Sequence, residues 1–496
     1  MRTIQLLNKA GLLVNALAKG PKTHSELAKQ LGEPRSSIYR ITSSLEEVGL
    51  IQTNNEGQLG LGVRILHLGE SAVDALVNRT LLRQNLGWLR DQLGMTAFFC
   101  TVQQDQIICL DRQEGADIDL IYLAPGRVLP SKKGAVAHVL QREGPPKSWS
   151  WDDGELASGV ASVAVAVKDS SGNILGAVAV AGLSASIGNN TETIRDALRK
   201  TAVSIADMPP ATTEEFDSSR INEPNSPSVI VKAATLLEVL RHEGQANSAR
   251  LAEVLGEPIS SVYRMLHTLT SIGWVEQDGK RGSYRIGLIM LSLAEAQLRH
   301  MDLRKIADQT MRNIHALTGE TTFLCVRHGI RAVCIDRVDG DRVNSRVLQL
   351  GTSLPLHVGA APRALLAFEG RRAWETYATN LGFEGHNWSK GPSRAELFQN
   401  LDEDRSKGFC LVDNEITPGI AAVGAPIYNH RGEVVASLSM SGLREGILQD
   451  NNDGQSAVEL ILQGSAEISK ALGATILKDN GGNKTLPLPT PVSSVV

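Results

Sequence analysis

The sequence contains few cysteines, no long apolar run and no strong net charge. Five cysteines among 496 residues are too few for a disulfide framework, which favours a reducing, cytoplasmic setting. No stretch comes near the roughly 18 uninterrupted apolar residues of a membrane-spanning helix. The formal net charge of −4 excludes a globally basic chain, so any contact with nucleic acid must be local. The sequence shows no metal-ligand spacing, and we expect no cofactor.

The composition is otherwise that of a large globular protein. Hydrophobic residues make up 42% of the chain and charged residues 21%, so sizeable cores can form. At about 100–200 residues a domain, the length suggests roughly three or four domains.

An internal repeat runs through most of the chain. Twelve residues between Leu27 and Gly49 recur unchanged 224 positions later. A second block, from Gly94 to Gly115, recurs at an offset of 225, and a third, beginning at Asp153, recurs at 260. The offset grows from 225 to 260, so the first copy lacks 35 residues, between about positions 138 and 152. The sequence therefore holds two unequal copies of one plan.

Each copy opens with the pattern of a helix-turn-helix. Thr23 and Glu26 form a capping box that starts the second helix of the first copy, and Asn247 is the expected cap in the second copy. Both second helices should stop at Leu-Gly, and Glu-Pro should begin a third helix with proline in its first turn. Two short helices around a glycine-containing turn are typical of a DNA-reading corner.

The third helix of each copy carries the candidate DNA contacts. Serine hydroxyls and arginines near its N-terminus can meet phosphates and base edges in a major groove. A β-hairpin, the wing, follows in each copy, and the second wing should grip DNA more strongly because it is basic. The candidate residues are Arg35, Ser36, Ser37, Tyr39 and Arg40, then Ser260, Ser261, Tyr263 and Arg264, with Lys280 and Arg281 on the second wing. One isolated match could be an ordinary helical corner, but the recurrence of Ser-Ser-x-Tyr-Arg with a wing argues against this.

These motifs resemble the IclR family of regulators. The resemblance covers nearly all of the second half and less of the first. Its markers are Leu255-Gly256-Glu257-Pro258, Tyr284-Arg285-Ile286-Gly287, Thr318-Gly319-Glu320-Thr321, Asp336-Arg337-Val338-Asp339-Gly340, Leu354-Pro355-Leu356-His357 and Ala425-Pro426-Ile427. The family implies an α+β fold, in which a winged helix joins a GAF-like effector domain, an antiparallel sheet flanked by helices. It also implies dimers or tetramers controlled by small, often carboxylate or aromatic, metabolites.

The resemblance and the residues together predict an effector site in the second copy. Ser439 and Ser441 are two apart on a predicted strand, so both hydroxyls face one side of the sheet and can donate to a carboxylate or phenol. The resemblance places the pocket loop at 357–361 and a closing loop at 413–415. The candidate residues are His357, Gly359, Ala360, Ala361, Asp413, Glu415, Ser439 and Ser441. Alternatively, the two serines could face solvent, and Asp413 and Glu415 could cap a turn. His357, Asp413 and Ser439 could suggest a hydrolase triad, but the sequence has no Gly-x-Ser-x-Gly nucleophile elbow to support it.

The first copy has lost these candidate groups. Ala179 and Ala181 stand at the serine positions, Lys132 replaces His357, and Val136 replaces Ala361. We therefore expect the first effector-type domain not to bind the same ligand and to persist as a dimerisation or structural partner. The predicted organisation is a winged helix at 1–67, a truncated effector-type domain at 68–207, a proline-rich linker at 208–228, a second winged helix at 229–291, a complete effector domain at 292–477 and a disordered tail at 478–496.

Two cysteine pairs invite a redox interpretation. If the hairpin turns at His328-Gly329, Cys334 faces Phe323 and Cys325 lies on the diagonal. Diagonal neighbours are about 7–8 Å apart, beyond ordinary disulfide reach. The cysteines are therefore better explained as small buried hydrophobes.

The expected function is sequence-specific transcriptional regulation on double-stranded DNA, at a quasi-palindromic operator, by a homodimer of duplicated chains without enzymatic activity. We expect a cytoplasmic protein with a small-molecule effector and no membrane partner. The alternative is an architectural DNA-binding protein with vestigial sensor domains.

Overall fold

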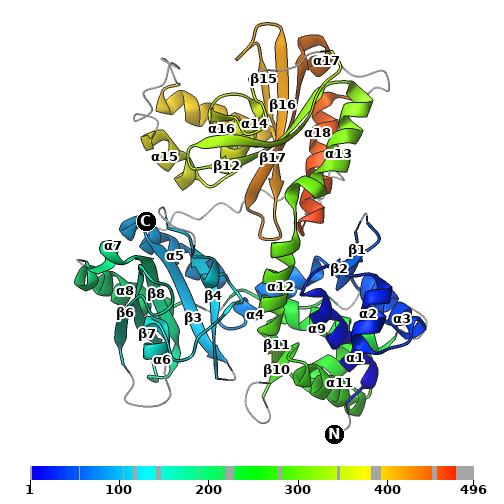
Figure 1. The fold of residues 1–496 in the computed structure, drawn as a ribbon, viewed down its shortest axis with the longest axis vertical. Helices are drawn as coiled ribbons and strands as arrows, with labels where there is room; N and C mark the ends of the chain where they lie inside the picture. The colour runs from blue at the N-terminus through cyan, green and yellow to red at the C-terminus, as the bar shows by residue number, and fades with distance from the viewer. Residues whose placement is uncertain are drawn as a thin grey trace. The chain divides into compact units, whose positions relative to one another are not determined.

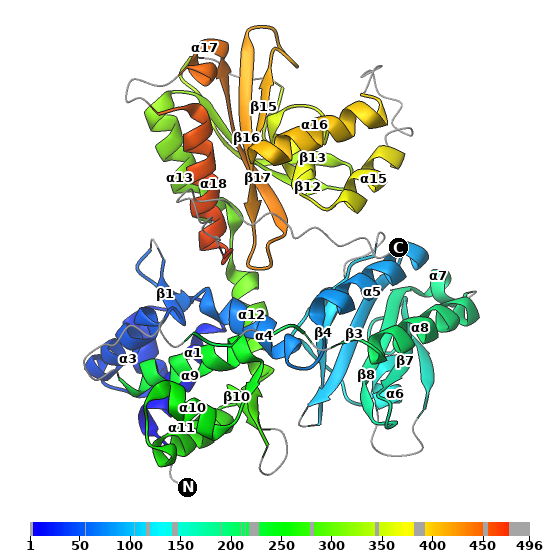
Figure 2. The same cartoon turned by 180° about the vertical axis from the view of Figure 1, so that it is seen from behind.

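The computed structural model describes residues 3–475 except 55, 104, 116–119, 141–146, 189, 210, 214, 218–227, 278–281, 343–346, 381–391 and 450–454. The chain forms two compact units, Met1–His300 and Met301–Val496, shown from two sides in Figures 1 and 2. Within the described ranges, no helix has both the length and the apolar character needed to cross a membrane.

The first unit contains two winged helices. The first consists of α1 (Gln5–Leu17), α2 (His24–Leu31), α3 (Arg35–Glu47), β1 (Ile51–Thr53) and β2 (Leu59–Leu61). The second consists of α9 (Val229–Glu243), β9 (Gln245–Ala246), α10 (Ser248–Leu255), α11 (Ile259–Ser271), β10 (Val275–Gln277) and β11 (Tyr284–Ile286). The predicted helix-turn-helix and wing are confirmed in both copies.

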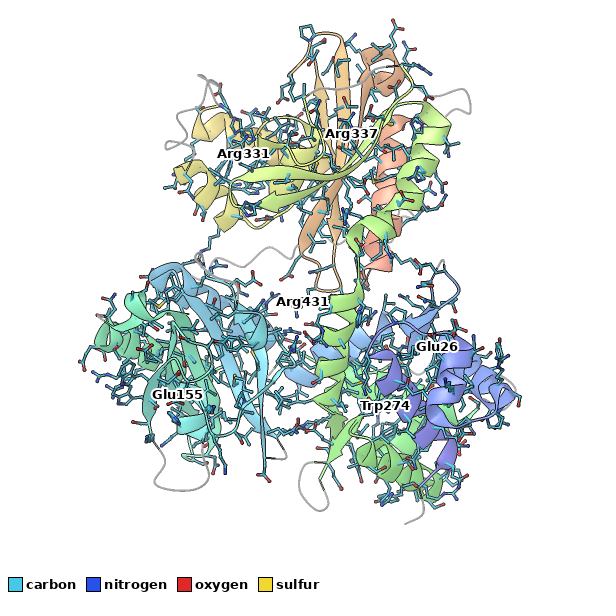
Figure 3. All side chains as sticks on the ribbon, in the orientation of Figure 1. Glu26, Glu155, Trp274, Arg331, Arg337 and Arg431 are labelled. Atoms are coloured by element: carbon cyan, nitrogen blue, oxygen red, sulfur yellow. The ribbon has the colours of Figure 1, made fainter. Side chains whose placement is uncertain are left out.

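The helix boundaries follow the predicted local signals. The Thr23 hydroxyl accepts a hydrogen bond from the Glu26 backbone N–H, and the Glu26 carboxylate accepts one from the Thr23 backbone N–H, which completes the capping box (Figure 3 labels Glu26). Asn247 caps α10 by accepting from the Arg250 backbone. Gly32 ends α2 with a φ of 64°, a left-handed conformation that glycine adopts without strain. Pro34 is the N-cap of α3, one residue before the predicted first turn.

The two winged helices pack against each other. Helix α4 (Arg64–Asp74) follows the first, α12 (Ile289–His300) follows the second, and these helices form a close pair. Gly69 permits this approach, because a Cβ atom there would lie 2.7 Å from the Cβ of Ala294. The Ile4 backbone also donates to Thr268 Oγ1 at 3.0 Å, and Arg64 faces Glu238 at 3.6 Å. One chain thus holds both helix-turn-helix corners in a single unit.

Two six-stranded antiparallel sheets form the effector-type domains. The sheet of the first copy has the order β5-β4-β3-β8-β7-β6, and that of the second has β14-β13-β12-β17-β16-β15. The first contains β3 (Thr96–Gln103), β4 (Gln106–Gln113), β5 (Val128–Leu129), β6 (Trp149–Asp153), β7 (Val160–Lys168) and β8 (Ile174–Leu183). The second contains β12 (Thr321–His328), β13 (Arg331–Val338), β14 (Ser353–Pro355), β15 (Cys410–Asp413), β16 (Ile420–Tyr428) and β17 (Val434–Leu443). The predicted α+β class with antiparallel sheets is confirmed.

Helices cover both faces of each sheet (Figure 1). The first domain has α5 (Arg79–Leu93), η1 (Ile121–Leu123), α6 (Ala135–Leu140), α7 (Ser184–Gly188) and α8 (Thr191–Ala206). The second has α13 (Leu303–Thr318), α14 (Ala360–Ala367), α15 (Arg371–Asn380), α16 (Arg394–Lys407), α17 (Arg444–Leu448) and α18 (Ala457–Ala471). One core of the second domain lies under α13 and α18, and the other lies under α14, α15 and α16.

The two domains differ where the offset between copies changes. Eight residues separate α6 from β6 in the first copy. That is too few for counterparts of α15 and α16, which have ten and fourteen residues. The predicted deletion is therefore the loss of this helical layer.

The cysteine register differs from the prediction. His328 pairs with Arg331, so the turn lies at Gly329 and Ile330, and Cys325 stands directly opposite Cys334. The predicted diagonal arrangement is wrong because the turn begins one residue later than expected. Cys100 and Cys109 are opposed in the same way, and all five cysteines are buried and free. The hydrogen bond with Cys334, together with burial, raises the pKa of the Cys325 thiol.

Candidate nucleic-acid interface and effector site

Helices α3 and α11 present matching polar faces. Arg35, Tyr39 and Arg40 are exposed on α3, whereas Ile38, Ile41 and Leu45 are buried against the rest of the winged helix. On α11 the exposed residues are Ser260, Tyr263 and Arg264. Ser36 is also exposed, but Ser37 and Ser261 are half-buried. The structure thus groups the predicted contacts of each copy on one helix, with one serine of each pair partly withdrawn.

The tyrosine of each recognition helix is held by the preceding helix. Tyr39 stacks on His24 with ring centroids 4.0 Å apart, and His24 lies 3.2 Å from Thr42. Ser248 donates to the Tyr263 hydroxyl at 3.0 Å. Both rings therefore have restricted rotamers before any ligand arrives, which reduces the entropy lost on binding.

The recognition-helix arginines have no counter-ion within the part of the chain that the structure describes. Among the described residues, no carboxylate forms an ion pair with Arg35, Arg40 or Arg264. A lysine elsewhere on the first winged helix does have a counter-ion, since Lys9 forms an ion pair with Glu33. An arginine left in solvent on an exposed helix is free to bind a phosphate or a guanine edge.

The two wings are antiparallel hairpins of three-residue strands. Asn54 at the first tip accepts backbone hydrogen bonds from Glu56 and Gln58, which shapes the turn. Lys280 and Arg281, the predicted contacts of the second wing, lie outside the described residues.

In the second effector domain, a row of three serines on β17 faces the start of α14. Ser437, Ser439 and Ser441 alternate with Leu438 and Met440, which belong to the core on the opposite face. The Ser437 hydroxyl donates to the Ala361 carbonyl at 2.8 Å, which fixes the direction of the row. Ser439 is 3% exposed and Ser441 is half-buried. Neither hydroxyl has a hydrogen-bond partner within the described part of the chain.

The first turn of α14 lies against this row of serines. Gly359 is the N-cap with φ of 84°, and its N–H donates to Glu415 Oε1 at 3.0 Å. Strand β16 approaches so closely that a Cβ on Gly424 would lie 2.8 Å from the Ala360 carbonyl oxygen. The structure thus brings Gly359, Ala360 and Glu415 together beside the serines.

A half-buried arginine joins the closing loop to the helical layer. Arg363 on α14 makes hydrogen bonds of 2.6 and 2.8 Å to Asp404 on α16, and lies 3.3 Å from Glu415. Glu415 therefore serves as a cap and an ion-pair partner, which is close to the capping role that the sequence left open.

His357 and Asp413 are engaged elsewhere. His357 Nδ1 lies 2.7 Å from the Tyr377 hydroxyl, and Asp413 forms an exposed ion pair with Arg444 at 2.8 Å. No hydrogen bond links His357, Asp413 and Ser439 within the described residues, so these three do not form a hydrolase triad. The sequence prediction missed Ser437, although the alternation of serines on the strand extends to it.

The first effector-type domain lacks the row of serines. Ala179 and Ala181 lie on β8 where Ser439 and Ser441 lie on β17. Val136 is buried on α6, and Lys132 is exposed. The hydroxyl groups of the second site therefore have no equivalents in the first.

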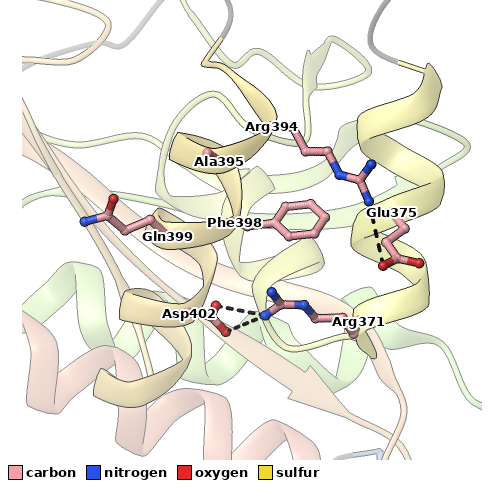
Figure 4. A pocket seen from close by; sticks show the side chains of 7 residues that line it. All are labelled: Arg371, Glu375, Arg394, Ala395, Phe398, Gln399 and Asp402. Carbon is pink, nitrogen blue, oxygen red and sulfur yellow. Dashed lines mark hydrogen bonds and ion pairs between the residues drawn. The ribbon is translucent and has the colours of Figure 1, made fainter. Parts of the chain in front are cut away.

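A separate surface hollow lies between α15 and α16 (Figure 4). Its charges are paired, with Arg371 2.9 Å from Asp402 and Arg394 3.8 Å from Glu375, and both guanidinium groups lie over Phe398. None of the predicted site residues lines it.

Comparison with known proteins agrees with this organisation. The IclR helix-turn-helix domain model matches residues 6–55 and 229–279, and the model of the C-terminal domain of the bacterial transcriptional regulator IclR matches 142–207 and 295–470. The chain belongs to the IclR family. Because each model matches twice, the chain is a tandem duplication of the family's two-domain plan.

Three relatives illustrate the relation. The HTH-type transcriptional regulator KipR of Bacillus subtilis is 28% identical over 253 residues, which are 51% of this chain and 99% of KipR. The HTH-type transcriptional repressor AllR of Escherichia coli K12 is 27% identical over 49% of this chain and 89% of AllR. The crystal structure of HmgR from Pseudomonas aeruginosa is 26% identical, with a TM-score of 0.41, over 49% of this chain and 96% of HmgR. The family is one of DNA-binding transcriptional regulators, so the predictions of a regulator and of no enzymatic activity are confirmed.

Proposed function

We propose that one chain reads two DNA half-sites with α3 and α11, under the control of a small carboxylate or aromatic metabolite bound in the second effector domain. The observation that carries this proposal is the duplicated recognition helix with unpaired arginines, held in one compact unit by the α4–α12 pair. A single-copy regulator would need two chains to present two such helices.

On DNA, Arg40 and Arg264 would bind phosphates or base edges at equivalent places in the two half-sites. The neighbouring serines and tyrosines complete each contact, and Lys280 and Arg281 add a basic wing to the second copy. Half-sites should be centred about 34–36 Å apart, or a multiple of this distance. Arg35 has Ile259 as its counterpart, which favours an operator whose two halves are similar but not identical.

In the effector domain, the Ser439 and Ser441 hydroxyls would donate to the metabolite's carboxylate or phenol. In the first turn of α14, Ala360 and Ala361 would supply backbone N–H groups, while the Gly359 N–H stays bonded to Glu415 and fixes the turn. Asp413, Glu415 and His357 would position the surrounding loops and not bind the ligand directly. Glu415 and Asp413 would hold the closing loop through their contacts with Gly359 and Arg444, and His357 would be held beside the site by Tyr377.

The first effector-type domain would serve as a structural partner. Its Gly126 carbonyl accepts a hydrogen bond from Ser292 of α12 at 2.7 Å, and Arg127 lies 3.3 Å from Glu295 on the same helix. This domain therefore braces the helix that pairs the two winged helices. We further propose that duplicated chains form a homodimer, and that the protein works in the cytoplasm without a membrane partner.

Thermal unfolding with and without ligand tests the effector assignment. The wild type and Ser439→Ala/Ser441→Ala would be melted against a panel of small and aromatic carboxylates, with exposed Ser406→Ala as the matched control. A ligand at 100 times its Kd should stabilise the wild type and the control by about 2.7 kcal/mol and the double variant much less. Coupling to DNA should then change operator affinity by about 5–150-fold. Operator affinity that is indifferent to every compound would favour the architectural alternative.

A further inference from the structure

A carboxylate occupies the first effector-type domain where the second has an apolar side chain. Asp152 on β6 corresponds to Val412 on β15, and Ser162 on β7 corresponds to Ala422 on β16. Val412 and Ala422 belong to the core beneath α14. Asp152 and Ser162 are each only 5% exposed, so the first domain has a buried polar pair at this place.

The Asp152 carboxylate binds the first turn of α6. Its Oδ2 accepts from the Ala135 N–H at 2.8 Å and also accepts a hydrogen bond from the Ser162 hydroxyl. Ala135 is the first residue of α6, so its N–H has no carbonyl partner within the helix. Its counterpart in the second domain is Ala360, whose N–H has no acceptor among the described residues.

The capping glutamate is a separate feature that both domains share. Glu155 accepts from the Gly134 N–H at 2.7 Å (Figure 3 labels Glu155), just as Glu415 accepts from Gly359. Asp152 is thus an additional carboxylate, present only in the domain that lacks the serine row. Burial and the charge of Asp152 together raise the pKa of the Tyr122 hydroxyl.

We propose that Asp152 is an internal ligand: the protein's own carboxylate occupies the place at the Ala135 N–H whose counterpart at Ala360 is left without an acceptor among the described residues of the second domain. The domain is then held permanently in one state, with α6, β6 and β7 joined through a single carboxylate. It gives the chain a constant brace, and its structure does not respond to free metabolites. This inference concerns the first copy alone and does not require that the second copy bind an effector.

Chemical rescue of the full-length chain tests this role. Asp152→Ala removes the carboxylate and leaves a space that formate, a bare carboxylate, matches. A three-atom ligand binds at best in the millimolar range, so formate is used at about 100 mM against equal sodium chloride. Asp153→Ala is the control, because Asp153 is the exposed neighbouring carboxylate and its one side-chain partner among the described residues is Ser184.

Two readouts report on the position directly. In Asp152→Ala the unfolding midpoint of the first domain should fall by about 4–10 °C, and formate should restore at least half of this shift. By hydrogen exchange, the Ala135 amide should exchange at least tenfold faster and be protected again by formate. The wild type and Asp153→Ala should respond to formate no more than to chloride.

A second variant covers the case in which Asp152→Ala does not fold. Asp152→Val/Ser162→Ala reproduces the apolar pair of the second domain, a combination this fold already accommodates. In this variant the Ala135 amide should again exchange at least tenfold faster than in the wild type. The proposal is overturned if Ala135 exchange is unchanged in the folded variants, or if formate protects wild type and variant equally. Neither result depends on the effector panel, so the two proposals fail separately.

Discussion

Replacing Gly69 by alanine should loosen the pairing of the two winged helices. The new Cβ would lie 2.7 Å from the Cβ of Ala294, 3.1 Å from the Met290 carbonyl oxygen and 3.3 Å from the Cα of Leu291. Carbon atoms in contact prefer about 3.5–4.0 Å, so α4 and α12 must move apart. Such overpacking costs about 1–3 kcal/mol, and the helix gains only about 0.5–1 kcal/mol on losing a glycine. The net loss of stability is therefore up to about 2.5 kcal/mol.

The matched control is Gly87→Ala on α5. Gly87 is also a helical glycine, and a Cβ there meets no atom within 4 Å. Gly87→Ala should therefore stabilise the chain by about 0.5–1 kcal/mol through helix propensity alone. Thermal unfolding measures both effects under the same conditions.

DNA binding extends the comparison from stability to function. Two winged helices linked in one chain bind DNA about 10²–10⁴ times more tightly than one winged helix only if their geometry lets both bind at the same time. On DNA selected by the wild type from a random library, Gly69→Ala should lower affinity for the intact site by about tenfold while affinity for a half-site changes little. If Gly69→Ala is as stable as Gly87→Ala and binds intact DNA as the wild type does, the two copies are not coupled through α4 and α12.

Two further predictions concern charged groups. Arg363→Ala leaves Asp404 buried without its partner and should cost about 3 kcal/mol, whereas Arg371→Ala, at an exposed ion pair, should cost under about 1 kcal/mol, as chemical denaturation would show. Burial opposes ionisation of Glu238, but its ion pairs outweigh burial and lower its pKa. The stability that the Glu238 ion pairs contribute is complete above about pH 4.3 and is lost as the pH falls through the folded-state pKa. The free energy of unfolding of Glu238→Gln should therefore fall less steeply with acid pH than that of the wild type. An unchanged acid dependence would contradict this prediction.

Local signals account for what the sequence could predict. The capping box at Thr23, the Leu-Gly stops and the Glu-Pro starts act within one helical turn, so the helix-turn-helix needed no tertiary information. The alternation of Ser439 and Ser441 placed both hydroxyls on one face for the same reason. The change of offset between copies located the missing helical layer.

Long-range pairing accounts for what the sequence missed. Asp413 forms an ion pair with Arg444, and His357 contacts the Tyr377 hydroxyl. These partners are distant in the sequence, and no periodic pattern of residues predicts such contacts. The predicted cysteine register was wrong because the hairpin turn lies one residue later than expected, and turn propensities do not distinguish two such registers. Asp152 did carry a signal, since its counterpart in the other copy is valine, but its meaning required the position of Ala135.

Footprinting on selected DNA tests the central claim most directly, that one chain reads two half-sites through α3 and α11. Wild type, Arg40→Ala and Arg264→Ala would be compared by hydroxyl-radical protection at equal saturation of the wild type. We predict two protected half-sites per chain about one or more helical turns apart, with each variant losing protection at a different half-site. A single protected site, or loss of the same half-site in both variants, would contradict the account.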